Sequence, residues 1–195
     1  MHTNAEEQIE LDPSSYININ DPCHFNLFCN SFSHYLDTYL PLYHNELVII
    51  CIGTDRATGD SLGPLIGYKL IDLNFNNVTI YGNLEQPVHA KNLVETAAYV
   101  EANHPGALIL SIDACLGTMQ NVGCISIREG SIRPGAGVKK DLPSIGHLHI
   151  IGVVNFSSLM NMVVLQNTRL SVVMKMADTI SSAIRYCLWK YNKRC

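Results

Sequence analysis

The stretch LVIICIGTDRATGDSLGP at residues 47–64 decides the fold class of this chain. It begins with an apolar run, rich in β-branched residues, that ends abruptly at Gly53. A polar loop follows, with Asp55 and Asp60 on either side of Arg56, and the loop closes on a helix start. A short, continuous apolar run of this kind predicts a central parallel strand that is buried on both faces. Because ligands of open α/β sheets bind outside the carboxyl ends of the strands, this loop is a candidate site.

The rest of the chain alternates between strand and helix patterns. We expect helices over residues 32–40, 65–73, 88–102 and 168–193, and strands over residues 48–52, 78–81, 107–112, 122–127 and 149–154. This order predicts an α/β fold of three layers, with a mostly parallel twisted sheet flanked by helices. Residues 1–30 are polar and are expected to form a loosely ordered N-terminal extension, and residues 31–195 a single α/β domain.

Composition excludes several classes of protein. With 195 residues, 47% of them hydrophobic and 15% charged, the chain is not intrinsically disordered. The high apolar content favours a buried subunit interface, so we expect a homo-oligomer. The net charge of −4 and the lack of a large basic cluster argue against nucleic-acid binding. The absence of a leader pattern and of an 18-residue apolar run predicts a soluble cytoplasmic protein with no membrane partner. Seven cysteines without a CxxC motif predict reduced thiols.

Asp60 and Asp113 form the candidate catalytic pair. Each follows a predicted strand, and the carboxyl ends of parallel strands share one edge of the sheet. Two carboxyl groups at one cleft can share a proton, so that one acts as a base toward water and the other as an acid. A helix N-terminus near Gly63 would favour the anionic form of Asp60, which makes Asp60 the expected base. The alternative is that Asp60 caps that helix and Asp113 begins a turn.

The sequence gives weaker support for a divalent metal site at the same edge of the sheet. Glu85 and His89 follow the second strand and, with the aspartates at positions 55, 60 and 113, would make a hard-ligand set. No tight ligand motif joins them, so no metal or other cofactor is favoured.

The glycine-rich segment 130–146 is a second candidate part of the site. Long loops in compact domains are often functional, and Gly135 and Gly137 would let this one close over a substrate or donate backbone N–H groups. A surface connection without function is the alternative.

Asp55, Arg56 and Gly53 would shape the first loop. Cys115 is the thiol nearest to Asp113 in sequence, but no histidine is placed to activate it as a nucleophile.

Several separate motifs together resemble the YyaC-type sporulation proteins of endospore-forming bacteria. They are, in chain order, CIGTDRATGDSLGPLIG, YGNLEQPVHAKNL, LILSIDACLG, GSIRPGAGVKKDLP, IIGVVN and VLQNTRLSVVMKMA. That family is similar to the spore germination protease and more remotely to the hydrogenase maturation endopeptidases.

This resemblance implies a phosphorylase/hydrolase-like fold and an atypical aspartic peptidase that acts on small acid-soluble spore proteins. TGDSLGP resembles the loop that carries one catalytic aspartate of the germination protease, which falls on Asp60, and SIDACLG resembles the strand end that carries the second, which falls on Asp113. SIRPGAGVKK resembles a glycine-rich loop of the same enzyme.

The sequence is therefore compatible with two functions. The first is an intracellular peptidase of sporulation or germination, located in the cytoplasm of the developing spore. The second is a catalytically silent binding or scaffold protein of the sporulating cell, in which the glycine-rich loop and the apolar surface serve a partner interface.

Overall fold

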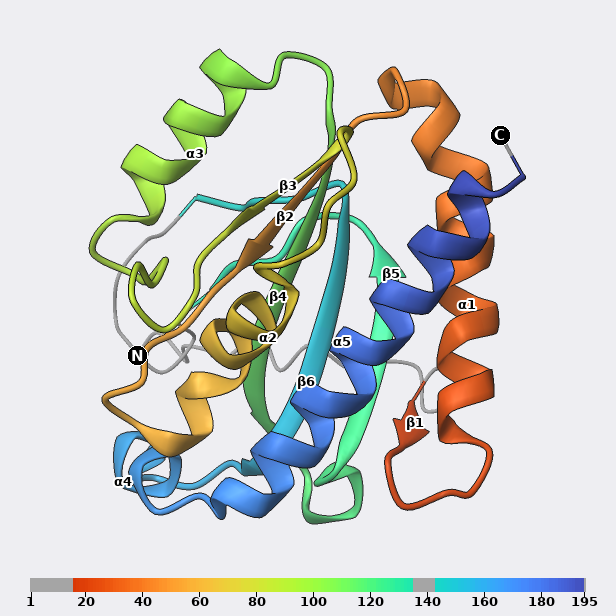
Figure 1. Cartoon of the computed structure of the whole chain (residues 1–195). Helices are drawn as coiled ribbons and strands as arrows, with labels where there is room; N and C mark the ends of the chain where they lie inside the picture. The colour runs from red at the N-terminus through yellow and green to blue at the C-terminus, as the bar shows by residue number, and fades with distance from the viewer. Residues whose placement is uncertain (1–15, 135–142, 195) are drawn as a thin grey trace, which may run out of the picture.

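The computed structural model describes residues 16–134 and 143–194. Their helices, 3-10 turns (η) and strands follow in the order β1 (Ile17–Asn18), α1 (His24–Tyr39), η2 (Leu40–Tyr43), β2 (Leu47–Cys51), η3 (Thr58–Ser61), α2 (Leu62–Leu70), β3 (Val78–Tyr81), α3 (Leu93–Asn103), β4 (Leu108–Gly117), η4 (Met119–Asn121), β5 (Cys124–Glu129), β6 (Leu148–Phe156), α4 (Asn161–Gln166) and α5 (Leu170–Asn192). Figure 1 shows these elements along the chain.

The strands form one mixed sheet of six, in the order β1-β5-β6-β4-β2-β3. Strands β3, β2, β4 and β6 run parallel, whereas β5 is antiparallel to both β6 and β1. The expected mostly parallel α/β sheet is thus confirmed, with an antiparallel extension on one side. The strand expected at 122–127 is β5, at the position of that extension.

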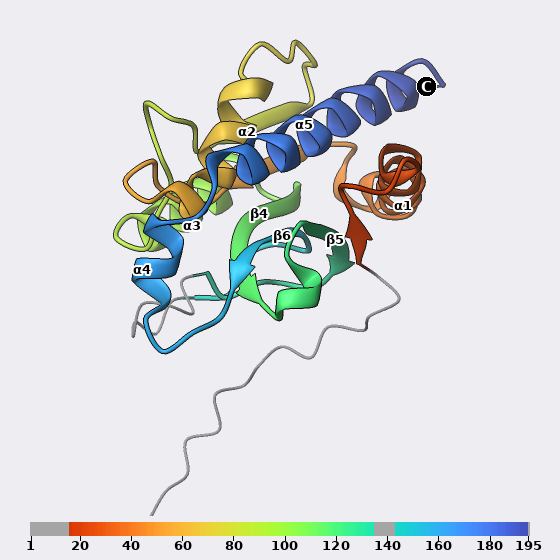
Figure 2. The ribbon, with the colours of Figure 1, turned by 90° about the horizontal axis from the view of Figure 1, so that it is seen from below.

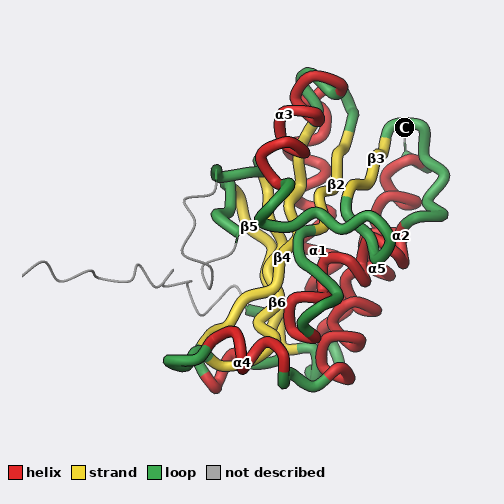
Figure 3. Tube along the Cα trace, turned by 90° about the vertical axis from the view of Figure 1, so that its left-hand side faces the viewer, coloured by secondary structure: helices red, strands yellow, loops and turns green. Residues whose placement is uncertain are grey.

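Helices cover both faces of the sheet, which gives the three expected layers. One hydrophobic core lies between the sheet and α1, α2 and α5, and a second, smaller core lies between the sheet and α3. The tube view shows the strands between these two groups of helices (Figure 3). Seen from below, α5 crosses the molecule beside α2 and α1 (Figure 2). No helix in the described ranges is long and apolar enough to cross a membrane.

The N-terminal boundary expected at residue 30 falls inside α1, which begins at His24. Phe28, Phe32 and Leu36 follow at helical spacing and are all buried, so the apolar stripe starts a turn earlier than expected. Ile17 in β1 pairs with Ile125 in β5. The expectation of a loosely ordered extension is therefore wrong for residues 16–30, and residues 1–15 lie outside the described ranges.

Helix α2 packs on the sheet through two glycines. A Cβ atom added to Gly63 would overlap the backbone of Ile52, and one added to Gly67 would overlap the carbonyl oxygen of Gly82. Backbone therefore lies directly against backbone at both positions, which fixes the start of α2 relative to the ends of β2 and β3. The helix begins at Leu62, ahead of Pro64, because proline is tolerated in a first turn.

Candidate functional site

The loop after β2 folds back over the end of its own strand. Gly53 has a φ of 140°, and a Cβ atom there would overlap the backbone carbonyl oxygen of Asp60. The backbone N–H of Thr54 donates to that same oxygen at 3.0 Å, and the N–H of Asp60 donates to the carbonyl of Ala57 at 3.0 Å. These contacts hold Asp60 directly above Gly53, at the carboxyl end of the strand.

Asp113 lies inside strand β4 and not at its end. The strand was expected to finish at residue 112, but it continues to Gly117 because residues 113–117 pair with β6. The N–H of Ile52 donates to the carbonyl of Ile112 at 2.7 Å, which sets Asp113 at the level where β2 gives way to the loop.

The side chain of Asp113 faces the α3 side of the sheet. Ile109 and Cys115 belong to the core on that side, and side chains of one strand alternate between faces, so Asp113 shares their face. It is buried, with 9% of its surface exposed, and its Oδ1 accepts a hydrogen bond from the N–H of Ala114 at 2.8 Å.

The two carboxyl groups interact electrostatically. Burial raises the pKa of Asp60 to about 6, against a hydrogen bond from the Thr54 backbone and the nearby ring of His89, which both lower it. Burial, and next the charge of Asp60, raise the pKa of Asp113 well above its ordinary value. With a pKa of about 6, Asp60 is mainly ionised at neutral pH, whereas burial and the charge of Asp60 favour the protonated form of Asp113. This division suits one base and one acid.

The start of α2 is expected to favour the anionic form of Asp60, whereas burial raises the pKa of this carboxyl above its ordinary value. The residue that precedes α2 is Ser61, and its side chain makes no capping hydrogen bond to the helix.

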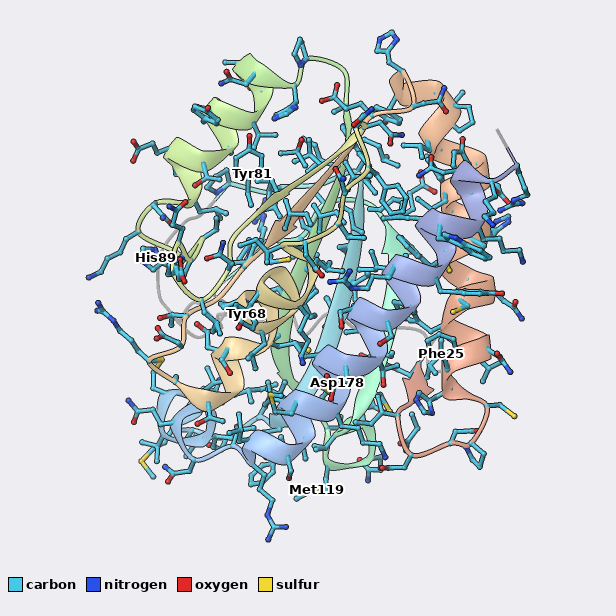
Figure 4. All side chains as sticks on the ribbon, viewed as in Figure 1. Phe25, Tyr68, Tyr81, His89, Met119 and Asp178 are labelled. Carbon is cyan, nitrogen blue, oxygen red and sulfur yellow. The ribbon has the colours of Figure 1, made fainter. Side chains whose placement is uncertain are left out.

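His89 joins the site by a route that the sequence did not reveal. It was expected near the first turn of a helix, but α3 begins only at Leu93. Val88 instead forms a parallel bridge with Ile52, and its carbonyl accepts the N–H of Gly53 at 2.8 Å. This contact brings the neighbouring His89, labelled in Figure 4, near enough for its charge to lower the pKa of Asp60. Its Nδ1 is buried and has no hydrogen-bond partner in the described part of the chain.

The other predicted site residues are not brought into the pair. Asp55 and Arg56 are exposed in the loop, where the N–H of Arg56 donates to Oγ1 of Thr54 at 3.3 Å. Glu85 is exposed in a turn fixed by Asn83, whose Oδ1 accepts the N–H of Glu85 at 2.8 Å. Gly135 and Gly137 lie outside the described residues.

The described residues do not assemble the hard-ligand set considered from the sequence. Among residues 16–134 and 143–194, no three His, Cys, Asp or Glu side chains are grouped so that they could hold a metal ion. Glu85 is exposed in its turn, and His89 is the one residue of this set that acts on the pKa of Asp60 from outside the two aspartate positions.

The thiol near the site is not activated. Burial and the charge of Asp113 raise the pKa of Cys115 to about 12, so the sulfur stays protonated at neutral pH. The six cysteines of the described residues form no disulfide with one another. His147 and His149 have structural partners: the ring of His147 accepts the N–H of Ile109 at 3.0 Å, and that of His149 bonds to the carbonyl of Gly130 at 2.8 Å.

Comparison with known proteins agrees with this architecture. A family model described as "Protein of unknown function (DUF1256)" matches residues 16–183. The chain belongs to this family. It is 47% identical over 138 residues to the protein YyaC of Bacillus subtilis (strain 168), covering 71% of this chain and 67% of YyaC. The resemblance to YyaC expected from the motifs is therefore confirmed.

A solved structure shares the fold. The hydrogenase maturation protease HycI from Thermococcus kodakarensis KOD1 superposes with a TM-score of 0.54, over 81% of this chain and 98% of HycI. The two sequences are 15% identical, so the likeness concerns the fold alone. The expected three-layer α/β fold, related to that of the maturation endopeptidases, is confirmed.

Proposed function

We propose that this protein is a peptide hydrolase whose catalytic residues are Asp60 and Asp113. The observation that carries the proposal is the placement of two interacting carboxyl groups at the carboxyl edge of the sheet, one buried in the central strand β4 and one on the loop above β2. Fold likeness to a maturation protease supports the same class of reaction. The resemblance to the germination protease suggests the substrate, small acid-soluble spore proteins in the cytoplasm of the developing spore.

In this mechanism the ionised Asp60 takes a proton from a water molecule. The water oxygen attacks the carbonyl carbon of the scissile peptide, and a tetrahedral intermediate forms. Asp113 then gives its proton to the leaving nitrogen, and the C–N bond breaks. Asp113 ends ionised and Asp60 protonated, so transfer of one proton between the two restores the starting state.

Cleavage of purified small acid-soluble spore protein tests the proposal. Removing a positioned acid or base costs about 100-fold to 10,000-fold in rate, so Asp60→Asn and Asp113→Asn are each expected to lose at least that much. Asp55→Asn is the matched control, because it is the same change on an exposed carboxyl of the same loop. Cleavage that persists in both Asn variants at the wild-type rate would remove the pair from the mechanism.

A binding or scaffold function is the second candidate, and one surface favours it. Large apolar side chains are exposed on and beside α4, namely Leu159, Met160, Met162 and Val163. Exposed apolar patches mark sites of protein interaction. Under this alternative the wild type cuts no spore protein, and a deletion strain regains its phenotype fully with either Asn variant.

A further inference from the structure

A groove opens beside the proposed catalytic pair, between the free edge of strand β3 and the start of α3. It has a volume of about 490 Å³, and its lining includes Tyr81, Asn83, His89, Asn92 and Thr96. A second hollow of about 280 Å³ shares Tyr81, Asn92 and Thr96 and extends the groove along α3. Figure 4 labels two of the lining residues, Tyr81 and His89.

The wall of the groove is already fixed in place by its own hydrogen bonds. The amide of Asn92 accepts the N–H of His89 at 2.8 Å and donates to the carbonyl of Pro87 at 3.0 Å. Oδ1 of Asn83 accepts two backbone N–H groups of the next turn. The hydroxyl of Tyr81 lies 2.8 Å from Nε2 of His104. A wall held in this way needs little rearrangement to receive a ligand.

His89 differs from these hydrogen-bonded side chains of the wall. Of the residues that line the groove, it has the one buried side-chain polar atom without a partner in the described ranges, its Nδ1. A buried polar atom left unpaired is unfavourable, and such atoms are uncommon unless a ligand or a catalytic role accounts for them. The groove is the open space from which a partner can arrive.

The groove is linked to the surroundings of Asp60 through two of its lining residues, Val88 and His89. Val88 lines the groove, and its carbonyl bonds to the N–H of Gly53, the residue over which Asp60 lies. His89 therefore belongs both to the groove and to the surroundings of Asp60. A chain lying in the groove would reach Asp60 by passing His89.

We propose that this groove is the substrate cleft and binds an extended polypeptide, with His89 contacting the main chain of the substrate. The occupant is an extended chain because the groove follows β3, an edge strand of the sheet, and edge strands present backbone groups that pair with extended peptides. This inference rests on the proposed hydrolytic function, and it assigns to His89 a contact with substrate beside Asp60.

Binding tests the cleft separately from cleavage. The Asp113→Asn protein is titrated with the fluorescein-labelled spore protein used in the cleavage assay, followed by fluorescence anisotropy. Thr96→Trp fills the groove and is expected to weaken binding about tenfold or more, which corresponds to about 1.4 kcal/mol. Ala98→Trp, the same side chain at an exposed position of α3 outside the groove, is expected to bind as the parent does. Circular dichroism on both variants verifies that they are folded.

The His89→Gln variant tests for a direct contact with substrate, because a purely structural role of His89 would not change the quantities measured. In the cleaving enzyme, loss of the imidazole raises KM, and it also shifts the acidic limb of the rate profile to higher pH, because a group that lowers the pKa of Asp60 is gone. Within the described residues, His89 and Asp113 are the charged groups that interact with Asp60, and His89→Gln changes only the first.

The outcomes separate the two proposals. If the labelled chain binds and Thr96→Trp blocks its binding, but the wild type cleaves no spore protein, the cleft is supported and the hydrolase is refuted. If the protein cleaves but Thr96→Trp and Ala98→Trp behave alike, the cleft is refuted and the hydrolase stands. Absence of binding to the Asp113→Asn protein also refutes the cleft.

Discussion

Replacing Asp60 by asparagine is expected to stabilise the protein at neutral pH while it removes the proposed base. Burial raises the pKa of Asp60 from 3.8 to about 6, so the folded protein carries this carboxylate at a cost. At 1.36 kcal/mol for each pKa unit, the difference corresponds to about 3 kcal/mol. Because Asp60 is half-buried and solvent screens part of its charge, about 1–3 kcal/mol is the expected gain. Asparagine keeps the size and the acceptor oxygen without the charge.

The sign of the effect changes with pH in a defined way. Well below pH 3.8 Asp60 is protonated in the folded and unfolded states, so it contributes nothing. As the pH rises, the unfolded chain ionises first and stability falls, until the folded carboxyl also ionises at about pH 6. The advantage of Asp60→Asn over the wild type should therefore grow between about pH 4 and pH 6 and then stay constant.

Urea unfolding at constant ionic strength, at a series of pH values across this range, measures the free energy of unfolding for both proteins. Asp113 contributes its own pH dependence to each of them, so the difference between the two curves is the quantity to compare. Asp55→Asn serves as the control, because it makes the same change on an exposed carboxyl of the same loop. A destabilised Asp60→Asn, or a difference that does not change with pH, would refute the argument from burial.

Two further predictions concern the thiol beside the site and the start of α1. Cys115→Ala is expected to cleave within about threefold of the wild-type rate, because a thiol with a pKa of about 12 is not the nucleophile; a loss as large as that of Asp113→Asn would contradict this. Phe28→Ala is expected to lower the free energy of unfolding by about 3–5 kcal/mol. Leu27→Ala, its half-exposed neighbour, should change it by less than about 1 kcal/mol; equal effects in urea titrations would mean that this turn is not part of the core.

The sequence predicted the sheet well where burial alone dictates the pattern. Val48 to Cys51 is continuously apolar, and in the structure it lies in a central strand buried on both faces. The sequence pattern predicts that this strand ends at Ile112, before the polar Asp113, whereas β4 continues to Gly117. A polar residue can lie inside a strand when a neighbouring strand continues to pair with it, and here β6 supplies that pairing up to Gly117 after the pairing with β2 has ended at Ile112.

The candidate site was harder to predict, since long-range contacts assemble it. The aspartates at positions 60 and 113 were identified from strand ends and motif resemblance, and the structure brings them into electrostatic contact. His89 had only a weak local signal. Its position depends on the bridge between Ile52 and Val88, and no local periodicity encodes a contact across 36 residues of chain. Helix α4 was missed because NMVVLQ is short and exposes its apolar side chains.

The glycine contacts of α2 have a consequence for how this site can change over time. Because Gly63 and Gly67 bring the helix backbone onto the sheet backbone, no rotamer change can absorb a substitution there. A methyl group at either position would push α2 outward, and the preceding turn with Asp60 would move with it. The location of one proposed catalytic carboxylate is therefore set by two residues that have no side chain, and drift at these two positions would alter the reaction geometry before it altered any residue that touches the substrate.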